Sequence, residues 1–195
     1  MNMEWIKKRM ASKLYILLLF ILSCGFYSTK GSLPAHIDSI HINPIVNESS
    51  EYSLSDQLLD DITESLINEN VVKIKSWNLA DSRLDIIILD VKDTPNIYGL
   101  KDNTFDQVDE WKITINCDVT WLDVINNTVL FETNIKTSGI YGTSSDINVD
   151  GIDNDGDNLI DSNDSDEFGP PREGAIRIAV EKLSREIING ITSTW

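Results

Sequence analysis

The chain has 195 residues, of which 32 are acidic and 16 basic, and its formal net charge is -16 at pH 7. Because nucleic-acid phosphates repel such a surface, we predict no nucleic-acid partner. The length fits one domain with a substantial core better than two domains.

An export signal opens the chain. A basic segment, 7–13, precedes an apolar run, 14–22, that is shorter than the roughly 20 residues needed to cross a bilayer. The run ends in Ser23-Cys24-Gly25, which resembles a bacterial lipobox, whose cysteine is acylated. We therefore predict a lipoprotein signal peptide at 1–23 and lipid attachment at Cys24. The alternatives are an uncleaved membrane anchor and an ordinary signal peptide.

The first half of the mature chain contains a tether, a strand and a helix. Residues 24–35 lack periodicity and are typical of a tether, which leaves 36–195 as one domain. Isoleucines from 37 to 45 predict a strand that bends or ends near Pro44. Apolar residues three and four apart across 54–67 predict an amphipathic helix.

Strand patterns dominate the middle of the chain. Segments 71–75 and 84–92 predict strands. Residues 94–99 then interrupt the strand pattern, and the polar stretch 101–107 predicts an exposed loop. Alternation across 111–121 and again across 129–137 predicts a long hairpin with one buried face. Cys117 shares the parity of the apolar residues in the first of these strands, so we predict a buried thiol. With Cys24 acylated, no internal disulfide can form.

A second amphipathic helix closes the domain. Apolar residues recur at helical spacing across 172–192. The predicted elements follow the order β-α-β-β-β-β-α, and each of the two helices needs an apolar surface to pack against. This combination indicates the α+β class. We predict a two-layer sandwich in which both helices cover one face of a mixed four- to five-stranded sheet.

Several short motifs occur in an order that resembles one known family. They are Cys24-Gly-Phe-Tyr-Ser28, Leu33-Pro-Ala-His-Ile37, Asn47-Glu-Ser-Ser-Glu-Tyr52 and the terminal Ile191-Thr-Ser-Thr-Trp195. Together they resemble the LptE family of lipopolysaccharide-assembly lipoproteins. The resemblance implies a protein anchored by its lipid to the periplasmic face of a Gram-negative outer membrane. It also implies a non-catalytic plug and chaperone within the LptD β-barrel, which helps to assemble the barrel and to deliver lipopolysaccharide.

None of these motifs identifies the residues that would contact lipopolysaccharide. The family is thought to use basic residues near one end of the sheet, and Lys101, Lys112 and Lys136 are the candidates, with solvated surface charge as the alternative. His36 and His41 have opposite parity on the first strand and are expected to be structural. The alternative function is a periplasmic lipoprotein that activates or scaffolds another envelope machine, such as a cell-wall synthase or a secretion pore.

An aspartate-rich stretch, 146–169, departs from the family and resembles an insertion. Alternate carboxylates at Asp153, Asp155 and Asp157, with Asp161 following, supply hard oxygen ligands at a spacing that suits Ca²⁺. Secondary candidates are Asp150, Asp164 and Asp166.

The spacing of this stretch excludes an EF-hand. With Gly156 at the sixth position of such a loop, Gly151 would occupy position one and Ser162 position twelve. Both positions require an acidic ligand, which neither glycine nor serine supplies. The stretch is similar instead to the shorter Asp-rich repeats of thrombospondin type 3. A disordered acidic loop without an ion is the alternative, and we expect no cofactor to be required.

Overall fold

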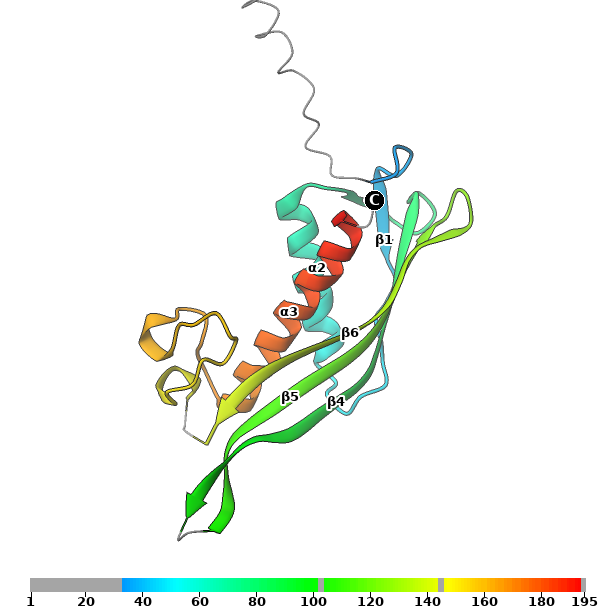
Figure 1. The fold of residues 1–195 in the computed structure, drawn as a ribbon. Helices are drawn as coiled ribbons and strands as arrows, with labels where there is room; N and C mark the ends of the chain where they lie inside the picture. Colours follow the sequence, from blue (N-terminus) through cyan, green and yellow to red (C-terminus); the bar gives the residue numbers. More distant parts are fainter. Residues whose placement is uncertain (1–32, 102–103, 144–145, 194–195) are drawn as a thin grey trace, which may run out of the picture. The chain divides into compact units, whose positions relative to one another are not determined.

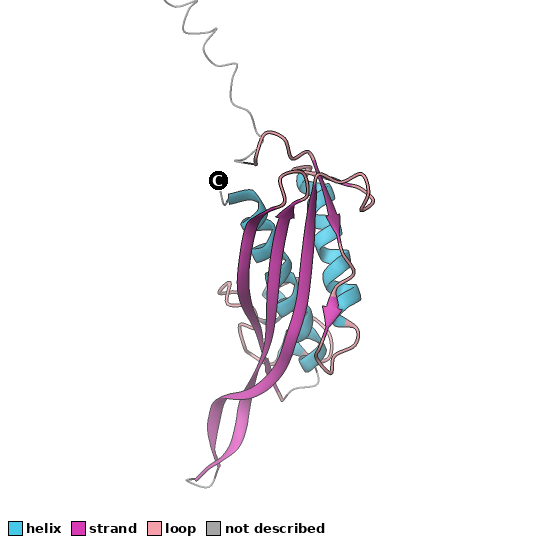
Figure 2. Cartoon of the chain, turned by 90° about the vertical axis from the view of Figure 1, so that its right-hand side faces the viewer, coloured by secondary structure: helices cyan, strands magenta, loops and turns pink. Residues whose placement is uncertain are grey.

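The computed structural model describes residues 33–101, 104–143 and 146–193, and it consists of a sheet with two helices on one face (Figures 1 and 2). The predicted signal peptide, Cys24 and most of the tether lie outside these ranges. Within the described ranges, no helix has the length and apolar character needed to span a membrane.

Within the described ranges, six strands form one mixed sheet in the order β3-β1-β4-β5-β6, with the short β2 paired to β4. Strand β1 pairs in parallel with both β3 and β4, and β2 pairs in parallel with β4, whereas the β4–β5 and β5–β6 pairs are antiparallel. Their bounds are β1 Ser39–Ile42, β2 Val46–Asn47, β3 Lys73–Ile74, β4 Ser82–Lys101, β5 Thr104–Asp123 and β6 Thr128–Gly142. This arrangement confirms the predicted two-layer α+β fold.

Two helices cover the inner face of the sheet. Helix α2 spans Leu54–Glu69 and α3 spans Pro171–Ser193. Each turns an apolar stripe toward the strands, as the spacing predicted; α2 buries Leu54, Leu58, Ile62 and Leu66, and α3 buries Ala175, Ala179, Leu183, Ile187 and Ile191. Gly139 allows α3 to approach β6 closely, because a Cβ at that position would lie 2.3 Å from the carbonyl oxygen of Ala175.

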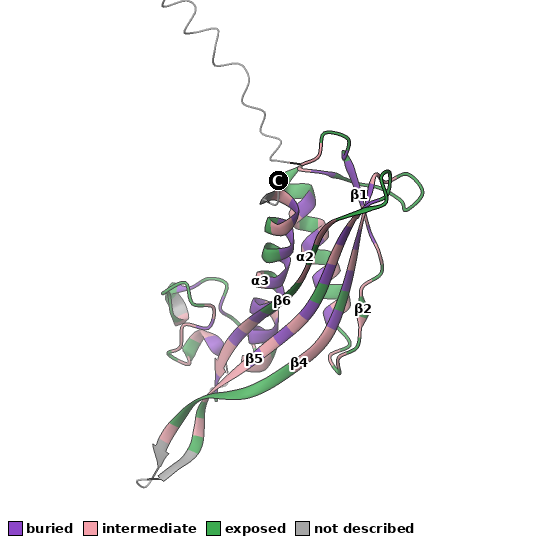
Figure 3. Cartoon of the chain, turned by 45° about the vertical axis from the view of Figure 1, so that its right-hand side comes forward, coloured by how far each residue is buried: buried purple, intermediate pink, exposed green. Residues whose placement is uncertain are grey.

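The centre of the core is the inner face of β5. Figure 3 shows buried residues alternating with less buried ones along the strands. The buried side chains of β5 are Ile113, Ile115, Cys117, Val119 and Trp121. Burial raises the pKa of the Cys117 thiol to about 12, so this cysteine is a core side chain and is not reactive at neutral pH.

The predicted interruption at 94–99 and the predicted loop at 101–107 are wrong for the residues that the structure describes, which leave out 102–103. Strands β4 and β5 continue through most of this segment as an antiparallel hairpin that extends past the end of β6 (Figure 1). Pro95 is accommodated because the register of β4 is irregular between Pro95 and Ile97. Among the described residues, β4 also has no second neighbouring strand beyond Ile88, so the proline interrupts no pairing on that side.

Candidate metal centre

The aspartate-rich loop connects β6 to α3 and is attached to both. The backbone N–H of Ile140 in β6 donates to the Asn154 carbonyl at 3.1 Å, and the Asn154 amide donates back to the Ile140 carbonyl at 2.7 Å. From α3, the Lys182 ammonium donates to the backbone carbonyls of Asp155 and Ser138. The loop thereby covers one end of the outer edge of β6.

Short turns curl the loop around its own carboxylates. Asp153 accepts hydrogen bonds from the N–H groups of Gly156, at 2.6 Å, and Asn158, at 3.1 Å. The Asp155 carboxylate accepts from the N–H of Asp157 at 2.8 Å. Gly156 has a φ of +87°, a left-handed conformation that glycine adopts without steric cost. These contacts set where the acidic side chains point.

Two groups of three carboxylates result, and both include Asp155. The first contains Asp153, Asp155 and Glu167, and the second contains Asp155, Asp157 and Asp164. Within each group, one oxygen from every side chain lies within 4.8 Å of the others. Glu167 was not among the ligands predicted from the sequence. The sequence signal for Glu167 as a ligand was limited to its acidic side chain and its position at the end of the same loop.

Three other predicted ligands belong to neither group. Asp150 accepts hydrogen bonds from the N–H groups of Gly142 and Ile152, and Asp161 accepts one from the N–H of Gly151 at 2.9 Å. These two carboxylates brace the loop. Asp166 is exposed at the surface.

Two carboxylates of the loop have raised pKa values. Desolvation raises the pKa of Glu167 to about 7, although the N–H of Asn154 donates to it and favours its ionised form. The pKa of Asp164 is raised by its hydrogen bond with Asp166 and by burial. Hard oxygen donors with this desolvation fit a divalent cation such as Ca²⁺, which would supply the charge that favours ionisation.

The motif that begins at Asn47 forms a hydrogen-bonded turn before α2. The Asn47 side-chain oxygen accepts from the backbone N–H of Ser49 at 2.9 Å and from its hydroxyl at 2.7 Å. The Asn47 amide donates to the carbonyl of Glu51 at 2.8 Å. The turn explains why asparagine and serine stand two residues apart in this motif.

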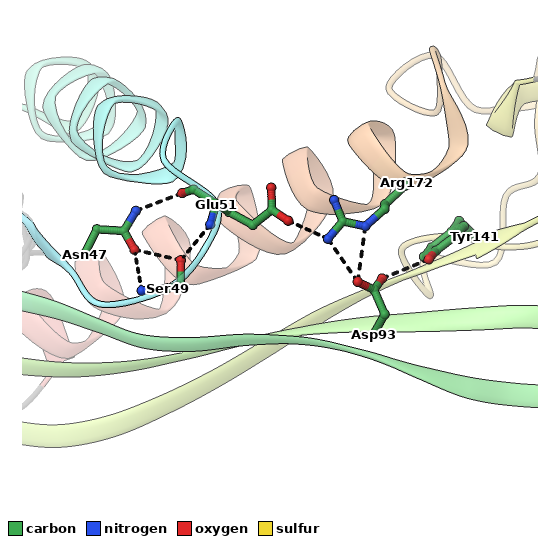
Figure 4. A network of polar contacts seen from close by, with 6 residues as sticks. All are labelled: Asn47, Ser49, Glu51, Asp93, Tyr141 and Arg172. Atoms are coloured by element: carbon green, nitrogen blue, oxygen red, sulfur yellow. Dashed lines mark hydrogen bonds and ion pairs between the residues drawn. The ribbon is translucent and has the colours of Figure 1, made fainter.

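Arg172 connects this turn to the sheet (Figure 4). Its guanidinium donates to the Glu51 carboxylate at 2.6 Å and to the Asp93 carboxylate at 2.9 Å. The Tyr141 hydroxyl donates to the other oxygen of Asp93 at 2.8 Å. Since Arg172 lies at the start of α3, this network fixes the end of the acidic loop against β4. Neither Arg172 nor Asp93 was singled out from the sequence.

His36, in the Leu-Pro-x-His-Ile motif, contacts the turn between β5 and β6. Its Nε2 lies 2.6 Å from the carboxylate of Asp123, and the Asn126 amide donates to the same carboxylate at 2.8 Å. Burial acts to raise the pKa of Asp123, but hydrogen bonds from the Asn126 backbone and from His36 lower it to about 2. The contact therefore holds the start of the domain to the end of β5.

This contact predicts an acid-sensitive contribution to stability. Because the folded pKa of Asp123 is depressed, its contribution is present above the unfolded value of about 3.9 and is lost as the pH falls through about 2. Urea unfolding at pH 5, 4, 3 and 2 should therefore show a smaller loss of stability in Asp123→Asn than in the wild type over this range. Equal pH dependence of the two proteins would contradict the assignment.

The outer face of the sheet is polar and carries two of the predicted basic residues. Asn134 donates to the side chains of Asn116, at 2.9 Å, and Asp118, at 2.8 Å. Lys136 and Lys112 share this face by strand alternation. Lys101 ends β4.

No protein-family model and no curated protein sequence matches the chain. Among solved structures, it is similar to a hypothetical protein from Chlamydia trachomatis, at 13% identity and a TM-score of 0.50, over 80% of this chain and 98% of that one. This likeness shows a shared fold.

Bacterial lipoproteins are also among the similar solved structures. Uncharacterized lipoprotein B from Nitrosomonas europaea has 13% identity and a TM-score of 0.47, over 83% of this chain and 84% of that one. A minor lipoprotein from Acinetobacter baumannii has 12% identity and a TM-score of 0.45, over 80% and 94%. Membership of the LptE family stays a prediction.

Proposed function

We propose that the chain is a lipid-anchored outer-membrane lipoprotein that partners a β-barrel of the LptD type in lipopolysaccharide assembly. It acts as a plug and chaperone and catalyses no reaction. The ordered motifs after Cys24 support the choice of partner. Two of them make long-range contacts in the fold, since His36 reaches Asp123 and Glu51 reaches Arg172.

The observation that carries the proposal is the polar outer face of the sheet. The interior of a membrane β-barrel is polar, so a partner seated there needs a hydrophilic contact surface. The face offers hydrogen-bonding side chains from three adjacent strands, because Asn116 of β5 donates to Asp90 of β4 and accepts from Asn134 of β6. Lys112 and Lys136 on this face would contact lipopolysaccharide phosphates.

Site-specific crosslinking tests this proposal. A photoreactive amino acid replaces Lys136 on the outer sheet face of the full-length lipoprotein in cells, and a second variant carries it at the exposed Glu181 of α3. We expect the Lys136 position to crosslink to one large outer-membrane β-barrel, and the Glu181 position to give much less of that product.

The alternative function gives a different result. If the lipoprotein activates or scaffolds another envelope machine, the crosslinked protein will be a cell-wall synthase or a component of a secretion pore. Recovery of such a protein without a barrel would overturn the proposed partnership, as would equal barrel crosslinking from both positions.

A further inference from the structure

We infer that the loop at 146–169 binds two Ca²⁺ ions that share Asp155 as a bridging ligand. One ion is held by Asp153, Asp155 and Glu167, and the other by Asp155, Asp157 and Asp164. This inference is independent of the barrel partner.

Buried oxygen atoms in the loop point to a ligand. Glu167 is 1% exposed and Asp164 is 5% exposed, and each has a buried carboxylate oxygen with no hydrogen-bond partner among the described residues. Asn154, between two of the acidic ligands, is 1% exposed and has a side-chain oxygen in the same condition. The other oxygen of each carboxylate accepts a backbone N–H, but a buried carboxylate oxygen without a partner is costly, so a solvated acidic loop would turn these side chains outward. A bound cation removes the cost.

The donor chemistry selects the metal. All five side chains in the two groups are carboxylates, which exclude a site built for soft thiolate or imidazole coordination. Ca²⁺ accepts six to eight oxygen ligands in irregular geometry, whereas Mg²⁺ requires near-ideal octahedral geometry and usually keeps several waters. Two Ca²⁺ ions would also nearly neutralise the five carboxylates, which otherwise repel one another.

The position of the loop makes the ions matter to the whole domain. Asn154 is hydrogen-bonded to Ile140 of β6, and the backbone carbonyl of Asp155 accepts from the Lys182 ammonium of α3. Ordering the loop around two ions therefore stabilises the junction of β6 with α3 as well as the loop itself. We expect Ca²⁺ to raise the melting temperature by several degrees through mass action.

Calorimetric titration with Ca²⁺ tests the inference on detergent-solubilised full-length lipoprotein, stripped with chelator. We expect two equivalents to bind to the wild type and one equivalent to Glu167→Gln. Asp155→Asn, which alters the shared ligand, should bind neither ion in the concentration range that saturates the wild type.

The control variant is Asp161→Asn. Asp161 belongs to neither carboxylate group, and asparagine retains an oxygen that can accept from the N–H of Gly151. This variant should still bind two equivalents. Circular dichroism of each variant identifies loss of fold, and if Asp155→Asn does not fold, the comparison of Glu167→Gln with Asp161→Asn decides.

Three results would overturn the inference. The first is no saturable binding at millimolar Ca²⁺, and the second is a wild-type stoichiometry other than two. The third is a loss of binding in Asp161→Asn with both ions retained in Glu167→Gln. That result would show that the ligands are the regularly spaced aspartates predicted from the sequence, with Asp161 among them and Glu167 not.

Discussion

Replacing Trp121 with alanine should lower the free energy of unfolding by about 3–5 kcal/mol, the usual cost of truncating a large buried aromatic side chain. Trp121 is 0% exposed and lies on β5 between Leu84 of β4 and Phe131 of β6. Its removal would leave a cavity that strands paired on both sides can close only in part. Urea unfolding followed by circular dichroism measures the change.

The chain contains a matched control for this truncation. Trp77 is 72% exposed, so Trp77→Ala removes the same side chain without opening a cavity. We expect this variant to stay within about 0.5 kcal/mol of the wild type. Similar losses in the two variants would contradict the position of Trp121 in the core.

Replacing Cys24 with serine should release nearly all of the protein from the membrane. A serine cannot carry the thioether-linked lipid, and two or more acyl chains on one residue are what makes such anchoring stable. The domain at 36–195, whose described core includes the buried Ile37, should fold as before. Cell fractionation should find the wild type with the membranes and Cys24→Ser in the soluble fraction.

The second cysteine provides the control. Cys117→Ala changes a buried thiol on β5 and leaves the attachment site intact, so the protein should stay with the membranes. Two results would argue against lipidation at Cys24: membrane attachment of Cys24→Ser with an intact signal peptide, or release of Cys117→Ala. Mass spectrometry of the amino-terminal peptide identifies the acyl groups directly.

Periodicity in the sequence was enough to find the helices and the core face of the sheet. The apolar stripe of α2 and the alternation along β5 depend only on how side chains point from a helix or strand. The length of the β4–β5 hairpin was not predictable in this way. The segment after Lys92 has the proline and polar residues of a loop, but its pairing with β5 holds it in strand conformation through cross-strand hydrogen bonds.

In the acidic loop, too, some ligands were predictable from sequence spacing and others were not. Asp153, Asp155 and Asp157 were predicted as ligands because they lie close together in the sequence, and the structure groups them through the shared Asp155. Glu167 joins this cluster, where the N–H of Asn154 donates to it across the loop, whereas Asp161 lies outside the cluster and accepts from the N–H of Gly151. That contact depends on where β6 and α3 hold the ends of the loop.

The sequence by itself determined the acidic character of this protein, its predicted lipid anchor, the α+β class and the composition of the candidate metal loop. These properties follow from residue type and local spacing, which act over a few residues. The tertiary structure decided which carboxylates converge, that His36 meets Asp123, and that Arg172 joins Glu51 to Asp93. Such partners lie far apart in the chain, and only the packing of the helices on the sheet brings them within hydrogen-bonding distance.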